Sequence, residues 1–111
     1  MDVHQVAREL NSALGPTLVA ALSGVGDREL PTRWAQSDGP EPAPECAQRL
    51  RFAHEQWTRF AAGESEDAAR NWFICGNPRL DEGTPLTAIR ENRWQDVSAA
   101  VTSYLEGGWN G

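Results

Sequence analysis

The sequence predicts an all-α protein, on three observations. Apolar residues recur every three or four positions in several segments, as on one face of a helix. No stretch of four to eight residues alternates between apolar and polar side chains as a β-strand does. Glycines, prolines and capping residues separate the helical segments. The 111 residues, 40% of them hydrophobic and five of them Trp, suffice for one domain, or for two small helical subdomains that share a core.

The first two helices are bounded by clear local signals. The first is expected over residues 3–14, with Asp2 as its N-cap and Gly15 as its end. The second is expected over residues 16–23, where a proline occupies the first helical position and Gly24 stops the helix.

The third and fourth helices flank a proline-rich loop. The third is expected over about residues 28–36, with Asp27 as its cap, although Pro31 fits only in the first turn of a helix. Residues 38–44 then form an extended loop. A long linking helix is expected over residues 45–61, because its apolar positions have the strongest helical periodicity in the chain: Cys46, Leu50, Ala53, Trp57 and Phe60.

The second half is expected to hold three shorter helices. They cover about residues 66–74, 85–91 and 94–106. Ser65 and Thr84 are the expected N-caps of the first two, and Asn92 breaks the chain before the last. The reversal from Gly76 to Thr84 contains two glycines, a proline and a cap, which is more than a plain connector needs, so it predicts a shaped surface loop. We place the subdomains at residues 1–61 and 62–111.

Charge favours a protein partner over nucleic acid. The net charge is −6, and all ten basic residues are Arg. Residues 62–111 carry four Arg against eight acidic residues, whereas residues 1–61 carry six against eight. An acidic protein binds nucleic acid poorly without sequence specificity, because that affinity comes from cations on phosphates. It is better suited to a basic protein partner.

Several classes of protein find little support. No apolar run approaches the roughly 18 residues that span a membrane. The N-terminal residues lack the basic segment followed by an apolar segment that is typical of a secretory signal, so we expect a cytoplasmic protein. Cys46 and Cys75 belong to no CxxC motif and are expected to be reduced thiols rather than a disulfide or metal site. Neither His4 nor His54 belongs to a recognisable catalytic triad or set of metal ligands. The sequence also contains no glycine-rich phosphate-binding loop. We therefore expect a protein that is not an enzyme and uses no cofactor.

A helix-turn-helix is one candidate site. The helices over 16–23 and 28–36, joined by a short turn, have a suitable length for this motif. The second would present four residues to DNA: Arg28, Thr32, Arg33 and Gln36. The other interpretation is a helical corner with little DNA affinity, because this segment is near neutral in charge. The sequence leaves both open.

Two features of the second half suggest a protein-binding surface. Arg79 stands in a loop shaped by proline and glycine, where it is well placed for a directed ion pair. Trp109 and Asn110 lie in a glycine-rich tail that can reach into the cleft of a partner or dock on the protein's own core. The other interpretation is a frayed chain end.

These motifs carry a family resemblance. The chain resembles the Xre/MbcA/ParS-like toxin-binding family, the antitoxins of RES–Xre toxin–antitoxin pairs. The resemblance is specific over residues 71–105, and residues 1–44 resemble a degenerate Xre-type helix-turn-helix. The residues that match the family pattern are Asn77, Pro78, Leu80, Gly83, Thr84, Pro85, Leu86 and Ile89.

The resemblance implies an antitoxin with an N-terminal helix-turn-helix and a small C-terminal helical bundle that binds the toxin. It would neutralise a RES-domain NAD-degrading toxin by occluding the NAD pocket, as a homodimer within the complex, and would also bind its own operator DNA. The toxin-facing residues carried over by position are Asn77, Arg79, Leu80, Thr84, Trp109, Asn110 and Gly111. The alternative is a standalone helix-turn-helix transcriptional regulator whose C-terminal half only dimerises it.

Overall fold

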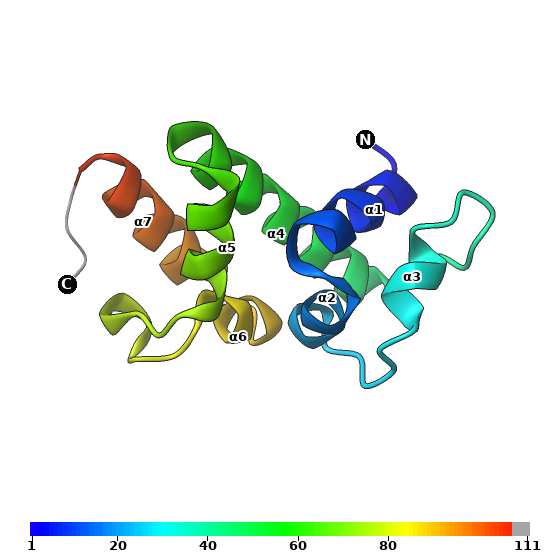
Figure 1. Cartoon of the computed structure of the whole chain (residues 1–111). Coiled ribbons are helices and arrows are strands. Elements are labelled where there is room, and N and C mark those ends of the chain that lie inside the picture. The colour runs from blue at the N-terminus through cyan, green and yellow to red at the C-terminus, as the bar shows by residue number, and fades with distance from the viewer. Residues whose placement is uncertain (108–111) are drawn as a thin grey trace.

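The computed structural model describes residues 1–107, all of which lie in helices, turns or loops (Figure 1). The all-α class is thus confirmed for this part of the chain. Within it, no helix is both long and apolar enough to cross a membrane. The elements in chain order are α1 (Val3–Leu14), α2 (Pro16–Ser23), α3 (Leu30–Trp34), α4 (Pro44–Gly63), α5 (Glu66–Ile74), the 3₁₀ helix η1 (Pro78–Leu80), α6 (Pro85–Arg90) and α7 (Trp94–Leu105).

The long helix α4 joins the two halves of the molecule. It packs against α1 and α2 at one end and against α5, α6 and α7 at the other (Figure 1). A further contact, between α2 and α6, connects the halves directly. The expected boundary after residue 61 falls in the last turn of α4, which continues to Gly63.

The hydrophobic core draws residues from both halves of the chain. Its main cluster takes Leu10 and Leu22 from the first half, Leu50 from α4, and Phe73 and Ile89 from the second half, all fully buried. A smaller cluster of Phe60, Ala69 and Val101 joins the end of α4 to α5 and α7. Burial of apolar surface on both sides of α4 is therefore what fixes the two halves together.

Three of the four expected N-caps are confirmed. Asp2 accepts a hydrogen bond from the backbone N–H of His4, Ser65 from that of Ala68, and Thr84 from that of Thr87. Each satisfies a backbone donor that the first turn of a helix leaves without a partner. Gly24 ends α2 with φ of +90°, in the left-handed region that glycine adopts most easily.

The expected third helix, residues 28–36, is wrong in length: α3 covers only Leu30–Trp34. Asp27 does not cap it directly, because its carboxylate accepts a bond from the backbone N–H of Glu29, 2.9 Å away, in a turn before the helix. After α3 the chain folds back, with the N–H of Gln36 donating to the Arg33 carbonyl. Gly39 then approaches that carbonyl so closely that a Cβ atom would overlap it.

Candidate functional site

The loop between α5 and α6 is closed by the backbone of one residue. The N–H of Asn77 donates to the carbonyl of Gly83 at 3.0 Å. The carbonyl of Asn77 accepts from the N–H groups of Leu80 at 2.8 Å and of Glu82 at 3.0 Å. These bonds hold the two ends of the loop side by side, so the segment from Asn77 to Thr84, at the lower left of Figure 1, is a compact feature (Figure 1).

Two side chains shape the loop from inside. The amide oxygen of Asn77 accepts from the backbone N–H of Arg79 at 2.9 Å, and Asn77 is only 6% exposed. Pro78, which has no N–H to satisfy, begins the 3₁₀ turn of η1. Leu80, 1% exposed, belongs to the main core cluster, and η1 packs on α7. The loop is thus anchored in the core at one residue and turned outward at its neighbours.

The tip of the loop has a constrained backbone. Asp81 and Glu82 both have positive φ, +57° and +66°. Residues other than glycine rarely adopt this region, and each such residue costs on the order of 1 kcal/mol. Gly76 lies so near this tip that a Cβ atom on it would be 2.9 Å from the Glu82 carbonyl oxygen. The bonds to Asn77 and the burial of Leu80 offset this strain.

An arginine on the neighbouring corner reaches the tip. Arg93 precedes α7; its Nη2 lies 3.4 Å from a carboxylate oxygen of Asp81, and its Nε donates to Asp96 at 3.1 Å. The Asp81 side chain is 91% exposed, so solvent screens the pair and its contribution to stability is below about 1 kcal/mol.

The structure assigns different roles to the toxin-facing residues inferred from the sequence. Arg79 is exposed on the loop. Thr84 is partly buried as the cap of α6. Asn77 and Leu80 are buried, and their side chains build the loop from inside. The other three expected residues, Trp109, Asn110 and Gly111, lie outside the described part of the chain.

Sequence reasoning missed the acidic tip. Asp81 and Glu82 read as ordinary turn residues, and nothing local shows that both adopt a left-handed backbone. Gly83 was the available signal of a tight turn. The ion pair of Arg93 with Asp81 spans 12 positions and has no sequence pattern of its own.

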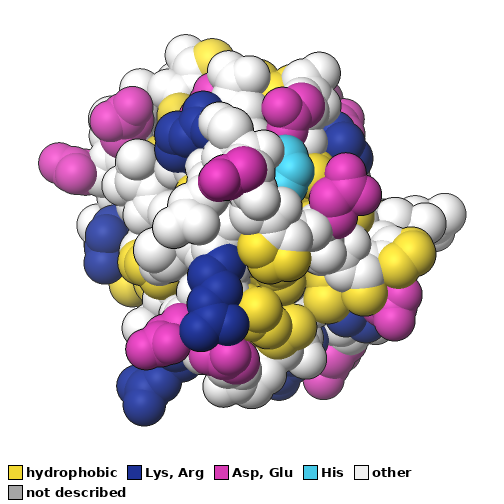
Figure 2. All heavy atoms as spheres, turned by 90° about the vertical axis from the view of Figure 1, so that its right-hand side faces the viewer, with side chains coloured by type: hydrophobic (Ala, Val, Ile, Leu, Met, Phe, Trp, Pro, Cys, Tyr) yellow, Lys and Arg dark blue, Asp and Glu magenta, His cyan; other side chains and the backbone are white. Residues whose placement is uncertain are grey.

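The four residues considered for DNA contact are exposed and lie around α3, but only Thr32 and Arg33 belong to the helix. With five residues α3 is about 7.5 Å long, which is short for a helix that reads a major groove. Arg33 pairs with Glu29 at 3.4 Å. Figure 2 shows the side of the molecule that carries α3: acidic and arginine side chains alternate around an apolar area, without a basic stripe (Figure 2).

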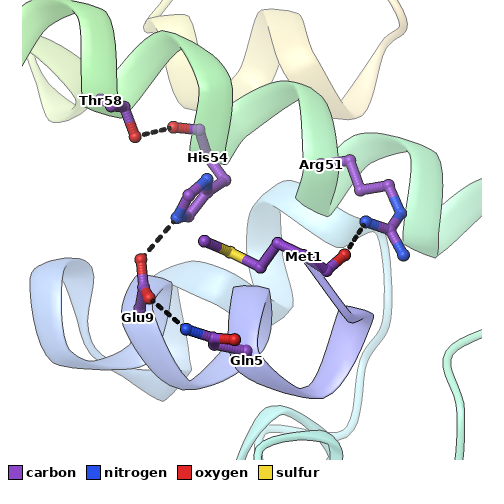
Figure 3. Close-up of polar contacts among 6 residues, drawn as sticks. All are labelled: Met1, Gln5, Glu9, Arg51, His54 and Thr58. Carbon is purple, nitrogen blue, oxygen red and sulfur yellow. Dashed lines mark hydrogen bonds and ion pairs between the residues drawn. The ribbon is translucent and has the colours of Figure 1, made fainter.

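Both histidines take part in contacts between elements. In Figure 3, Nε2 of His54 on α4 lies 2.8 Å from a carboxylate oxygen of Glu9 on α1, and Gln5 donates to the other oxygen at 3.2 Å (Figure 3). The bond to His54 holds the pKa of Glu9 below its ordinary value. Nδ1 of His4 lies 2.8 Å from the Trp34 carbonyl oxygen. The two imidazoles thus connect α1 to α4 and to the end of α3.

The two thiols are free, and they differ in environment. Cys46 is buried, and burial raises its pKa, whereas Cys75 is exposed just before the loop. Among residues 1–107, no three His, Cys, Asp or Glu side chains are grouped closely enough to hold a metal ion.

Comparison with protein-family models, with curated proteins and with solved structures finds no match to this chain.

Proposed function

We propose that this protein is an antitoxin that binds a RES-domain, NAD-degrading toxin and neutralises it by covering the NAD pocket. One observation carries the proposal. The residues that resemble the family pattern, from Asn77 to Ile89, form a single closed loop followed by a capped helix, in which the buried members support an exposed tip.

The form of this loop suits a protein contact. A surface that is already ordered loses little conformational entropy on binding, so more of the contact energy appears as affinity. Its exposed charged residues are Arg79, Asp81 and Glu82, which offer charges of both signs within four positions. A guanidinium can bind a carboxylate of a partner through two parallel bonds, and the acids suit a basic cleft.

The mechanism is occlusion, without a chemical step on this chain. The loop would cover the mouth of the pocket, and NAD would be excluded by volume and by the acidic residues beside it. The net charge of −6 favours approach to a basic, nucleotide-binding surface. Trp109, Asn110 and Gly111 remain part of the proposed contact on the basis of the resemblance.

The test is co-expression with a RES-domain protein whose gene lies next to the gene of this chain, followed by co-purification and an NAD-consumption assay. We expect a stable complex in which NAD consumption stops. Arg79→Ala should weaken inhibition roughly tenfold or more, as expected for loss of an interface arginine. The matched control is Arg28→Ala, an exposed arginine near α3 rather than on the loop. If NAD consumption is the same with and without this chain, the proposal is wrong.

A truncation separates the loop from the tail. Removal of residues 109–111 should reduce inhibition more than it reduces the melting temperature, because among residues 1–107 the buried members of both core clusters already lie between positions 6 and 101. A truncated chain that inhibits as strongly as the full chain would remove the tail from the contact and leave the loop alone.

A further inference from the structure

A cleft of about 550 Å³ opens between α1, α4 and the first turns of α5. None of its lining residues belongs to the Asn77–Thr84 loop. One wall, on α1, carries Arg8 and Glu9; the other, on α5, carries Glu66, Asp67 and Arg70. Trp57 of α4 lies between the walls. The cleft is large enough to take a few side chains of a ligand.

The two charged side chains of the α1 wall make hydrogen bonds within the protein. The carboxylate of Glu9 is bound by His54 and Gln5 (Figure 3). The guanidinium of Arg8 donates to the Ala35 carbonyl from Nη2 at 3.1 Å and from Nε at 3.3 Å. This wall is therefore fixed by contacts with α4 and with the end of α3.

The charged side chains of the α5 wall have no such partners within residues 1–107. Within residues 1–107, the side chains of Glu66, Asp67 and Arg70 make no hydrogen bond or ion pair. Arg70 follows Glu66 by four positions and Asp67 by three, spacings at which opposite charges commonly pair on a helix. Acids in a first turn also stabilise the positive end of the helix dipole. That effect explains the two carboxylates, but it does not explain why they line the same cleft as Trp57 and an unpaired guanidinium.

Trp57 supplies an aromatic surface with firm support. It is partly buried, and its ring packs on that of Phe73 with centroids 6.1 Å apart. Phe73 is itself fully buried in the main core cluster. The indole is thus held in place and still borders the cleft. A cleft lined by an aromatic ring and by carboxylates is a favourable environment for a cation, which gains from the ring quadrupole and from the opposite charges.

We propose that the cleft between α1, α4 and α5 binds a short peptide segment of a partner protein that presents a basic side chain beside an apolar one. The basic group would lie between Trp57 and the carboxylates of Glu66 and Asp67, and Arg70 would donate to a carbonyl of the peptide. The apolar side chain would cover the exposed part of the indole. This site is independent of the proposed antitoxin contact and is tested without a toxin.

The first test is an NMR titration of the full ¹⁵N-labelled chain with the acetylated and amidated tripeptide Leu-Arg-Leu. We expect shifts of the backbone amides of α5 and of the neighbouring turns of α1, and of the Trp57 indole N–H, which Trp57→Phe identifies. The tripeptide Leu-Glu-Leu should produce no shifts at the same concentrations. Equal responses to both tripeptides, or shifts spread over acidic residues throughout the surface, would overturn the proposal.

Variants locate the site. The pair Glu66→Gln and Asp67→Asn, made together, should weaken binding of Leu-Arg-Leu roughly five- to tenfold, since charge-assisted bonds are about twice as strong as neutral ones. Glu64→Gln is the matched control, because Glu64 is exposed two residues earlier and does not line the cleft. The dispersion of each spectrum reports whether the variant is folded. If the double variant is folded and binds as tightly as the control, the cleft is not the site.

Discussion

The backbone of Asn77 pairs with that of Gly83 across the loop, with the Asn77 N–H donating to the Gly83 carbonyl at 3.0 Å. This bond places the end of α5 beside the start of α6. The loop is therefore held by the backbone of Asn77 and by the buried side chains of Asn77 and Leu80, and not by the exposed residues at its tip. The stability of the loop and its contacts with a partner can therefore be tested separately.

Asn77→Ala should destabilise the protein by about 1 to 2 kcal/mol, because it removes the buried acceptor of the Arg79 N–H. Urea unfolding followed by circular dichroism measures this. Asn71→Ala is the control: Asn71 is exposed on α5, its side chain has no hydrogen bond within the described residues, and its variant should be nearly neutral. Equal effects of the two substitutions would show that the side chain of Asn77 does not support the loop.

Gly76→Ala tests the close approach of the loop to the end of α5. The new Cβ atom would lie 2.9 Å from the Glu82 carbonyl oxygen, a backbone atom that cannot move aside without opening the loop. We expect a loss of about 1 to 3 kcal/mol, as for other overpacked sites. Gly26→Ala serves for comparison, because no atom beyond the neighbouring residues would lie within 4 Å of a Cβ at that position. A neutral effect at Gly76 would mean that the loop adjusts freely.

Arg49 connects α4 to two distant turns, and Arg49→Met tests that connection. Its Nη1 donates to the Ser23 carbonyl at 2.9 Å, at the end of α2, and its Nε to the side chain of Asn92 at 3.1 Å, between α6 and α7. We expect a loss of about 1 to 2 kcal/mol in the free energy of unfolding. Arg51→Met, which loses only an exposed bond to the Met1 carbonyl, should cost much less. Equal costs would contradict a bridging role for Arg49.

The contact between Glu9 and His54 predicts a dependence of stability on pH. The bond from His54 lowers the pKa of Glu9 in the folded state below its ordinary value of 4.5. The charged carboxylate therefore stabilises the fold above that value, and the contribution is lost as the pH falls through the lowered pKa. Because the side chain is 46% exposed, we expect on the order of 0.5 kcal/mol or less.

Melting temperatures of the wild type and of Glu9→Gln between about pH 7 and pH 3 measure this contribution. The difference between the two proteins should shrink as the medium becomes more acidic. Glu55→Gln, an exposed acid on α4 whose side chain has no hydrogen bond within residues 1–107, should show no such trend. A difference for Glu9→Gln that stays constant over this range would refute the role of its charge.

Most of the secondary structure could be predicted because its signals act over short distances. Asp2, Ser65 and Thr84 cap the helices that follow them, since a side-chain oxygen needs only to reach a backbone N–H two or three residues away. Gly24 ends α2 through its own backbone conformation. The third helix was the exception, because a turn at Asp27 and a fold-back at Gly39 shorten it from both sides.

The sequence by itself determined the helical class, the capped helix starts and the position of the loop between α5 and α6. Only the tertiary structure decided that Asn77 and Leu80 are buried while Arg79 is exposed, and that Trp57 and Arg70 border one cleft. The physical reason is distance along the chain. Caps and turns depend on neighbouring residues, whereas burial and clefts depend on which helices meet around α4, and that follows from the packing of the whole core.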